Sequence, residues 1–234
     1  MSLKLGSTTI GSLYLGSTKI GEAYFGNVKV YGPSQPVPPV LPANTIRCKF
    51  STGYTPTIGD SQTLADASAN IWDIYKSGTD WRRLFNNITQ LEKVIAANAT
   101  GVTNMSYMFL KCTSLTSVPL FDTSSASNMD AMFSGCTNLA SVPLFDTSSA
   151  TTMYATFHSC SNLTSVPLFD TSLVTNMAYM FYNCTAVESG ALALYQQAST
   201  QATPPTSHDS TFANCGSNTV TGAAELAQIG IGWK

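Results

Sequence analysis

Charged residues are scarce in this sequence. Asp, Glu, Lys and Arg make up only 10% of its 234 residues, and the net charge at pH 7 is -2. So small a charge gives no electrostatic reason to bind nucleic acid or an anionic membrane surface. The sequence also lacks any run of the roughly 18 apolar residues that a membrane-spanning helix needs. We therefore expect no nucleic acid and no membrane among the partners of this protein.

Patterns typical of catalysis are missing as well. No Ser-His-Asp set can be recognised, no Gly-rich phosphate loop follows a strand pattern, and no metal-ligand spacing occurs. Of the two histidines, His158 follows a core Phe and should be exposed, whereas His208 occupies a repeat position that holds Met in other copies. Neither is a good catalytic candidate. We expect no enzymatic activity, no cofactor and no metal site.

The N-terminus reads MSLKLGSTTIGSLYLG and has no basic segment followed by a long apolar run. It therefore does not look like a signal peptide, and we expect the chain to be made and folded in a cytosol.

The N-terminal segment, residues 1–31, is built on three ten-residue units, LKLGSTTIGS, LYLGSTKIGE and AYFGNVKVYG, which run from residue 3 to residue 32. Apolar and polar residues alternate in each unit around a Gly-Ser-Thr or Gly-Asn turn, which predicts short strands joined by tight turns. A lone domain shorter than about 40 residues is rarely stable. We expect this small all-β segment to dock onto another copy of itself or onto a larger assembly.

Residues 32–43, GPSQPVPPVLPA, contain five prolines and are expected to form a semi-rigid extended spacer. An irregular surface loop is the alternative. Residues 44–79 are less regular: residues 46–50 look like a strand, and residues 68–75 fit either a strand or a short helix. Because an array of repeats needs an atypical end unit, we expect residues 44–79 to cap the array that follows.

A 24-residue repeat occupies residues 80–190. Its phenylalanines are Phe109, Phe133, Phe157 and Phe181, and its cysteines are Cys112, Cys136, Cys160 and Cys184. A diverged first copy has Phe85 and Ile88 at these two positions. An insertion at 190–208, in which we expect a short helix and a loop, precedes a last partial copy with Phe212 and Cys215. We expect residues 191–234 to form the C-terminal cap.

Each copy contains a pattern that predicts a short helix. Met105, Met108, Phe109 and Cys112 follow the spacing i, i+3, i+4, i+7, which marks one face of a helix of about two turns. A hydroxyl residue precedes the pattern in every copy and is expected to cap the N-terminus of the helix. These residues are Thr79, Thr103, Ser127, Thr151 and Thr175.

A second pattern, L-x-x-L-x-L, predicts a strand in each copy. It is formed by Leu115, Val118 and Leu120, and recurs from Leu139 and from Leu163. Pro119 and its equivalents remove a ladder donor and must shorten the strand. The predicted fold class is an α/β repeat solenoid of leucine-rich-repeat type, with one short strand and one short helix per 24 residues, behind a small N-terminal all-β segment.

The segment VPLFDTSSASNMDAMFSGCTNL and its copies closely resemble the BspA-like leucine-rich-repeat family over residues of about 80–215. This resemblance implies a solenoid used for adhesion or recognition in microbial surface proteins. The N-terminal ten-residue units, with the motif L-x-L-G-S-T, are similar to strand repeats at the start of virion proteins of Bacteroides-infecting phages.

Two ladders of repeated residues could mimic functional sites. The cysteines could suggest a metal or disulfides, but Ile88 replaces the cysteine in the first copy, which favours a buried structural thiol. Asp122, Asp146 and Asp170 are expected to accept backbone N–H groups in turns, and a bound calcium ion is the alternative. We expect the structural core to be formed by the residues that recur at the same repeat positions: Phe109, Phe133, Phe157, Phe181, Cys112, Cys136, Cys160, Cys184, Leu115, Leu139 and Leu163.

Tyrosines near the predicted helices are the candidates for contact with a partner, because tyrosine supplies rigid amphipathic area at interfaces. They are Tyr107, Tyr154, Tyr179 and Tyr182. Together these features predict a non-enzymatic phage virion protein, a head or tail fibre or decoration component. We expect it to assemble in the host cytoplasm as a homotrimer through residues 1–31 and to bind a host-surface glycan or protein through its repeats. A cell-surface adhesin of a Bacteroides-like bacterium is the alternative.

Overall fold

The computed structural model describes residues 41–234 and the backbone of six short strands within residues 3–31. The chain divides into two compact units, residues 1–40 and 41–234. In the first unit, three antiparallel hairpins follow the ten-residue period of the sequence. They pair β1 (Leu3–Leu5) with β2 (Thr8–Ile10), β3 (Tyr14–Leu15) with β4 (Thr18–Lys19), and β5 (Ala23–Phe25) with β6 (Val28–Tyr31). Most of the predicted spacer, residues 32–40, lies outside the described residues.

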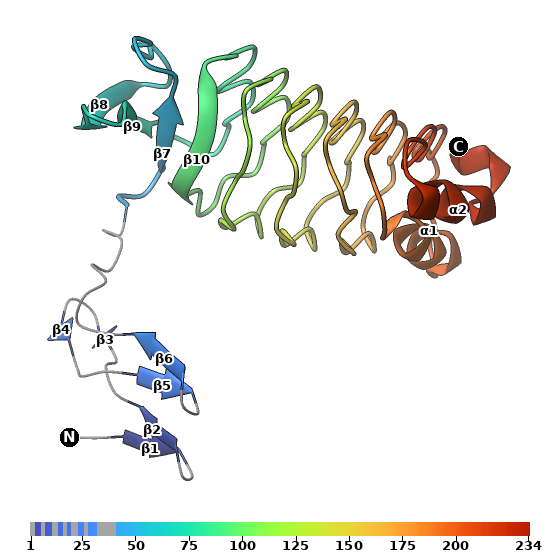
Figure 1. Cartoon of the computed structure of the whole chain (residues 1–234), viewed down its shortest axis with the longest axis horizontal. Helices are drawn as coiled ribbons and strands as arrows, with labels where there is room; N and C mark the ends of the chain where they lie inside the picture. Colours follow the sequence, from blue (N-terminus) through green and yellow to red (C-terminus); the bar gives the residue numbers. More distant parts are fainter. Residues whose placement is uncertain are drawn as a thin grey trace. The chain divides into compact units, whose positions relative to one another are not determined.

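The second unit begins with a four-stranded antiparallel sheet in the order β10-β7-β9-β8 (Figure 1). Its strands are β7 (Thr45–Phe50), β8 (Ser61–Asp66), β9 (Ile71–Tyr75) and β10 (Leu91–Asn98). The ambiguous segment at 68–75 therefore contains a strand and not a helix. Ile46, Cys48 and Phe50 alternate along β7 with partly exposed residues and are fully buried. Between them, the guanidinium of Arg47 pairs with the carboxylate of Asp73 on β9 at 2.7 Å.

Beyond the sheet, the chain forms a stack of similar 24-residue windings (Figure 1). Each of these windings is called a coil below. Residues 99–190 contain neither a helix nor a strand. Isolated parallel bridges connect successive coils instead, along a column that runs Asp80, Asn104, Asn128, Thr152, Asn176 and Ser207. The core runs lengthwise through the stack, because every coil packs only on the coils before and after it.

The predicted α/β repeat solenoid of leucine-rich-repeat type is therefore wrong. Among the described residues, strands occur only in the antiparallel sheet and the N-terminal hairpins, and the two α-helices there, α1 (Ala191–Thr200) and α2 (Val220–Gln228), both follow the repeats. The predicted helix is excluded by the backbone: Tyr107 and Lys111 both have a positive φ, 59° and 57°. Two left-handed residues four positions apart cannot belong to one right-handed α-helix.

The left-handed pair recurs in each coil and sets a different hydrogen-bond pattern. Its members are Arg83 and Asn87, Tyr107 and Lys111, Ala131 and Gly135, Ala155 and Ser159, Tyr179 and Asn183, and Ser210 and Asn214. Successive backbone N–H groups donate alternately to a carbonyl of the same coil and to a carbonyl of the next coil. The N–H of Met108 donates to the carbonyl of Met105 within the same coil at 3.2 Å, whereas the N–H of Phe109 donates to Met132 in the next coil at 2.8 Å. The spacing i, i+3, i+4, i+7 thus marks consecutive tight turns that are bonded to a neighbour.

The repeated hydroxyl residues do not cap helices, so this prediction is also wrong. From the second copy on, each donates its side-chain O–H and its backbone N–H to one carbonyl of the previous coil. Thr151, for example, donates to the carbonyl of Ser127 through Oγ1 at 3.1 Å and through N at 2.9 Å, and Thr175 does the same to Thr151. These residues therefore join coils to one another.

The strand predicted from L-x-x-L-x-L is absent too. Near this motif the coils share only isolated bridges, Lys93 to Ser117 and Ser165 to Ser189. The first leucine of each motif is buried, but the last is exposed: Leu120 is 66% exposed, Leu144 59% and Leu168 52%. The proline directly before each of these leucines has no N–H to donate to a strand ladder. The leucine side chain that follows it points into solvent.

A column of aromatic rings fills the centre of the stack. Phe85, Phe109, Phe133, Phe157, Phe181 and Phe212 stack in this order, with centroids 5.1–6.0 Å apart and planes within 12° of parallel. Trp233, in the 3-10 helix η1 (Ile231–Trp233), covers the last ring at 6.3 Å. All are buried.

Two helices close the C-terminal end of the stack (Figure 1). The helix expected in the insertion at 190–208 is α1. Its first residue is preceded by Gly190, which has no side chain to cap the helix, and the carboxylate of Glu225 from α2 accepts the N–H groups of Gly190 and Leu192 at 3.3 and 3.1 Å. Neither helix of the described part has the length and apolar character needed to cross a membrane.

Replacing Lys111 by glycine tests the turn structure. Lys111 is exposed and left-handed, so Lys111→Gly removes strain and should leave the free energy of unfolding unchanged or raise it by up to about 1 kcal/mol. A residue within a helix would instead lose about 1 kcal/mol. Urea unfolding followed by circular dichroism measures the difference.

The matched control for this substitution is Ala193→Gly in α1, where the residue is exposed and helical. It should destabilise the protein by about 1 kcal/mol. Equal losses for both variants would contradict the left-handed turn at Lys111.

Candidate functional site

The described residues 41–234 hold no group of three or more His, Cys, Asp or Glu side chains placed to bind a metal ion. His158 is half-buried, not fully exposed as predicted; its Nδ1 lies 3.0 Å from the hydroxyl of Ser159, and burial lowers its pKa below the usual 6.5. His208 stacks on Trp233 at 4.2 Å, and its Nδ1 lies 3.2 Å from the carbonyl of Gly232. Both histidines thus take part in packing.

The cysteines form a buried ladder of free thiols. The Sγ of Cys112 lies 3.1 Å from the carbonyl oxygen of Phe85 in the preceding coil, and Cys136, Cys160 and Cys184 repeat this contact at 3.0–3.1 Å. Burial raises the pKa of Cys112 and Cys215 from the usual 9.0 to about 12. Protonated thiols without solvent access are neither nucleophiles nor metal ligands. The predicted core phenylalanines and leucines are likewise all buried.

The aspartate ladder is held by turns. Asp122 accepts the backbone N–H of Ser124 at 3.0 Å and its hydroxyl at 2.7 Å, and Asp146 repeats both contacts with Ser148. Asp170 accepts the N–H of Ser172 at 2.8 Å. These hydrogen bonds lower the pKa of Asp122 and Asp146 below the usual 3.8. The carboxylates of Asp122 and Asp146 are therefore ionised at neutral pH, and all three aspartates are exposed.

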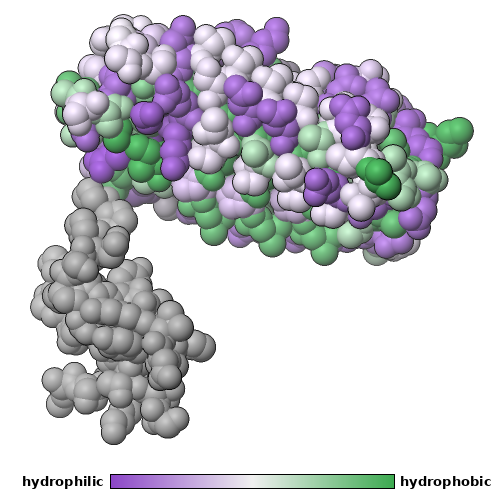
Figure 2. All heavy atoms as spheres, in the orientation of Figure 1, coloured by the Kyte–Doolittle hydropathy of each residue, from purple (hydrophilic) through white to green (hydrophobic). Residues whose placement is uncertain are grey.

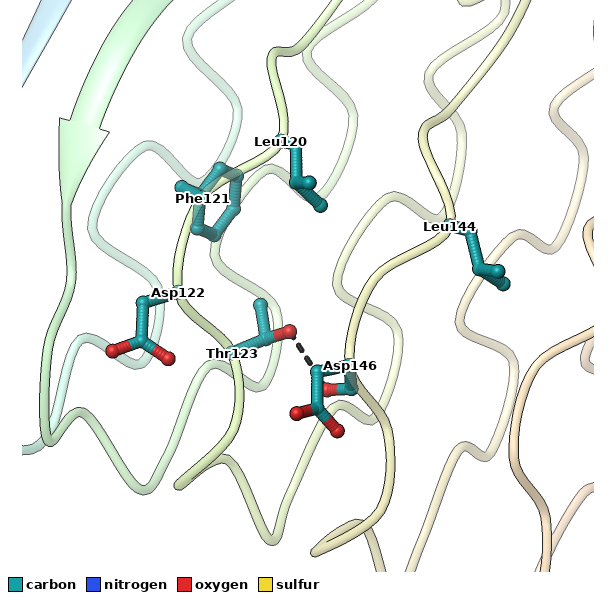
Figure 3. Close-up of a pocket in the computed structure, with 6 residues that line it drawn as sticks. All are labelled: Leu120, Phe121, Asp122, Thr123, Leu144 and Asp146. Atoms are coloured by element: carbon teal, nitrogen blue, oxygen red, sulfur yellow. Dashed lines mark hydrogen bonds between the residues drawn. The ribbon is translucent and has the colours of Figure 1, made fainter. Parts of the chain in front are cut away.

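The threonine after each aspartate ties its coil to the next one. Thr123 donates its hydroxyl to the carbonyl of Asp146 at 2.7 Å (Figure 3), and Thr147 donates to Asp170 at 2.8 Å. Thr171 has no equivalent coil after it. The side-chain oxygen of Gln201, which follows α1, accepts its hydroxyl at 2.8 Å, and the amide of Gln201 donates back to the Thr171 carbonyl at 3.0 Å. The cap thus continues the ladder of the repeats.

Beside the aspartates lies an exposed apolar strip, called the leucine row, which consists of Leu120, Leu144 and Leu168. Figure 3 shows Leu120 and Leu144 extending to the same side of successive coils, with Asp122 and Asp146 below them. A shallow groove of about 350 Å³ is lined by these four residues together with Phe121 and Thr123. A second groove, of about 410 Å³, continues past Leu168 to Gln197 and Gln201. Figure 2 likewise shows hydrophobic residues along the lower border of the stack.

The charge of the repeats is one-sided. Residues 112–233 contain no Lys or Arg, whereas they contain the carboxylates of Asp122, Asp130, Asp146, Asp170, Glu188, Asp209 and Glu225. The ion pairs of the described residues all lie in the N-terminal part, between Arg47 and Asp73, Lys49 and Glu92, Lys76 and Asp60, and Arg82 and Asp80. The net charge of the whole chain is close to zero, but its C-terminal half is acidic and repels anionic ligands.

Three of the four candidate contact tyrosines lie together, with a histidine that sequence reasoning did not include. We call Tyr154, Tyr179, Tyr182 and His158 the tyrosine–histidine cluster. The ring centroids of Tyr154 and Tyr179 are 5.9 Å apart, those of Tyr179 and Tyr182 5.7 Å, and those of His158 and Tyr182 5.0 Å. Tyr154 and Tyr179 are exposed, and the other two are half-buried. Two adjacent coils supply all four rings.

Tyr107 is separate from this cluster. It occupies the left-handed coil position that Tyr179 occupies three coils later, and both have a φ of 59°. Its ring lies 5.3 Å from the guanidinium carbon of Arg83, in a cation–π contact. The same tyrosine position therefore meets a cation in one part of the stack and other aromatic rings in another.

Comparison with known proteins identifies the family. Two overlapping segments, residues 60–162 and 113–216, match the family described as "Mycoplasma protein of unknown function, DUF285". Together the segments span residues 60–216, about two thirds of the chain, so the chain belongs to this family. No curated protein and no solved structure matches significantly.

The buried thiols should make stability depend on alkaline pH. Because folding raises their pKa, their contribution is complete below the usual thiol pKa of 9.0 and is lost as the pH rises from there toward about 12. Urea unfolding at several pH values should show a decline that begins near pH 9. In a Cys160→Ala variant the decline should be shallower. An identical slope in both proteins would contradict this account.

The threonine ladder gives a prediction on stability. Thr147 is 2% exposed, so Thr147→Val removes a buried donor to the carbonyl of Asp170 and should lower the free energy of unfolding by about 1–3 kcal/mol. Thr164→Val is the control, because Thr164 makes a similar bond to Ala140 in an exposed position. It should cost less than about 0.5 kcal/mol in the same urea titration.

Proposed function

We propose that this chain is a non-enzymatic attachment protein whose stacked coils bind another macromolecule on a host surface. The observation that carries the proposal is the leucine row: apolar side chains at the same position of consecutive coils are more than half exposed. Such a contiguous apolar strip with a polar border is typical of a contact surface on a soluble protein. Its grooves are shallow and bordered by carboxylates that are bonded within their own turns, which suits surface contact better than catalysis.

The setting we propose is a phage virion, in which the protein is a fibre or decoration component. The support is the N-terminal unit, whose three hairpins follow the ten-residue period that resembles the strand repeats of virion proteins. Residues 1–31 anchor the chain and join it into a homotrimer. The coils then reach the host surface.

A bacterial cell-surface adhesin is the second candidate, and one observation favours it. The family to which the chain belongs is described by its occurrence in Mycoplasma, which points to a cellular setting. The attachment mechanism of the coils is the same in both settings.

An antibody raised against the full chain distinguishes the two settings. Immunogold electron microscopy of the source culture, before and after prophage induction, should label released virions and leave intact cell envelopes unlabelled. Label on envelopes alone would support the adhesin and contradict the virion setting. Light scattering of the purified full chain should give the mass of three chains, and a monomeric mass would contradict anchoring through residues 1–31.

The leucine row is tested by the triple variant Leu120→Ser, Leu144→Ser and Leu168→Ser. Because these side chains are exposed, the free energy of unfolding should change by less than about 1 kcal/mol. Attachment of the fluorescently labelled full chain to intact host cells should fall about tenfold or more. The control replaces Val220 and Ile231 by serine. These residues are 90% and 88% exposed and begin α2 and η1, which follow the repeats. Equal attachment by all three proteins would contradict the role of the row.

A further inference from the structure

The tyrosine–histidine cluster lies on a different set of coil positions from the leucine row. The leucine row is formed by the last residue of each V-P-L motif. Tyr154 and His158 lie in the turn segment of one coil, and Tyr179 and Tyr182 lie in the turn segment of the next. The backbone around them is fixed from both sides. The N–H groups of Ser159 and Tyr179 donate to the carbonyls of Tyr182 and Asp209 in the following coils, at 2.7 and 3.0 Å. The rings are therefore presented by rigid turns.

The rings of the cluster contact one another in two ways. Tyr179 meets Tyr154 at 78° and Tyr182 at 65°, edge to face, whereas His158 and Tyr182 are parallel within 13°. Among the described residues, none of the three phenol hydroxyls has a hydrogen-bond partner. The cluster thus combines two exposed tyrosine rings, Tyr154 and Tyr179, with polar hydroxyls that are free to donate and accept.

These properties match one class of ligand, and we propose that the cluster binds an uncharged saccharide across the two coils. The C–H groups on the face of a pyranose ring carry a partial positive charge, and the face of an aromatic ring carries a partial negative charge. A sugar therefore stacks on a tyrosine face, while its hydroxyls bond to phenol, imidazole and amide groups. Tyrosine supplies such contact area with little loss of conformational entropy.

The charge of the surroundings decides against an acidic sugar. The carboxylate of Asp130 accepts the N–H of Tyr154 at 2.9 Å and therefore lies at the edge of the cluster. No Lys or Arg occurs anywhere in residues 112–233 to offset it. A uronic or sialic acid would meet the negative field of this carboxylate without a cation from the two coils that carry the rings. This inference deepens the proposed attachment function, on which it rests, by naming a ligand class for a second surface of the same coils.

Binding is tested on the full chain by calorimetry and saturation-transfer NMR with defined sugars. The neutral probes are hexasaccharides of glucose, mannose, galactose and N-acetylglucosamine, and the acidic probes are oligogalacturonate and sialyllactose. We expect at least one neutral hexasaccharide to bind, with saturation strongest on its ring C–H protons, and neither acidic probe to bind more tightly. No binding of any neutral probe at concentrations up to about 10 mM, or a preference for an acidic probe, would overturn the proposal.

Variants assign the binding to the cluster. Tyr179→Ala and Tyr182→Ala should each weaken saccharide binding by roughly tenfold or more, whereas Tyr179→Phe should keep most of it because the ring remains. Tyr107→Ala is the matched control, since it removes a tyrosine from the same coil position outside the cluster. It should bind like the unchanged protein. Equal losses for Tyr107→Ala and Tyr179→Ala, with both variants folded by circular dichroism, would refute the assignment.

The same variants separate this inference from the proposed function. If the leucine-row variant loses attachment to cells while Tyr179→Ala attaches normally and no sugar binds, the attachment function stands and the saccharide site is wrong. If sugars bind and Tyr179→Ala abolishes that binding, but the antibody labels neither virions nor envelopes, the saccharide site stands and the attachment function is wrong.

Discussion

Half of the backbone amides in the turn segment of each coil have no partner within that coil. The left-handed residues at positions such as Tyr107 and Lys111 direct alternate N–H groups toward the neighbour, and an unpaired buried amide is costly. A single coil is therefore not a stable unit, and the first and last coils need substitutes for the missing neighbour. The antiparallel sheet serves this purpose at one end, where the first coil's segment β10 pairs with β7. Gln201, Glu225 and Trp233 serve it at the other.

Periodicity in the sequence was sufficient to predict the length of the repeat and the positions of its buried residues, but not the local conformation. The apolar spacing around Phe109 fits an α-helix and a series of tight turns equally well, since both return a side chain to the same face after three or four residues. What separates them is the sign of φ at Tyr107 and Lys111, and neither residue type indicates a left-handed conformation. Gly135 and Asn183, at the position of Lys111 in other copies, were the available signal.

For the candidate surfaces, too, the sequence predicts single residues but not which of them lie together. Tyr154, Tyr179 and Tyr182 could be selected as contact residues because they fall between core positions, but their convergence with His158 depends on which coils are adjacent. The L-x-x-L-x-L pattern wrongly predicts a strand at the leucine row, because an apolar residue at a fixed repeat position is usually buried in a regular element. The preceding proline was the clue, since it ends backbone pairing just before Leu120. The acidic character of residues 112–233 was visible in the sequence and was concealed by averaging over the whole chain.

Successive coils meet through the same contacts, a phenylalanine on a phenylalanine, a thiol on a carbonyl and a hydroxyl on a carbonyl. A duplication or deletion of 24 residues would therefore join surfaces that already fit. The contact between Thr206 and Thr175 spans 31 residues and shows how an extra segment is accommodated, because the extra segment forms α1, which packs against the end of the stack and leaves the register intact. The length of this protein can thus change in whole steps of one coil, each of which adds or removes a share of the outward-facing rows without disturbing either end.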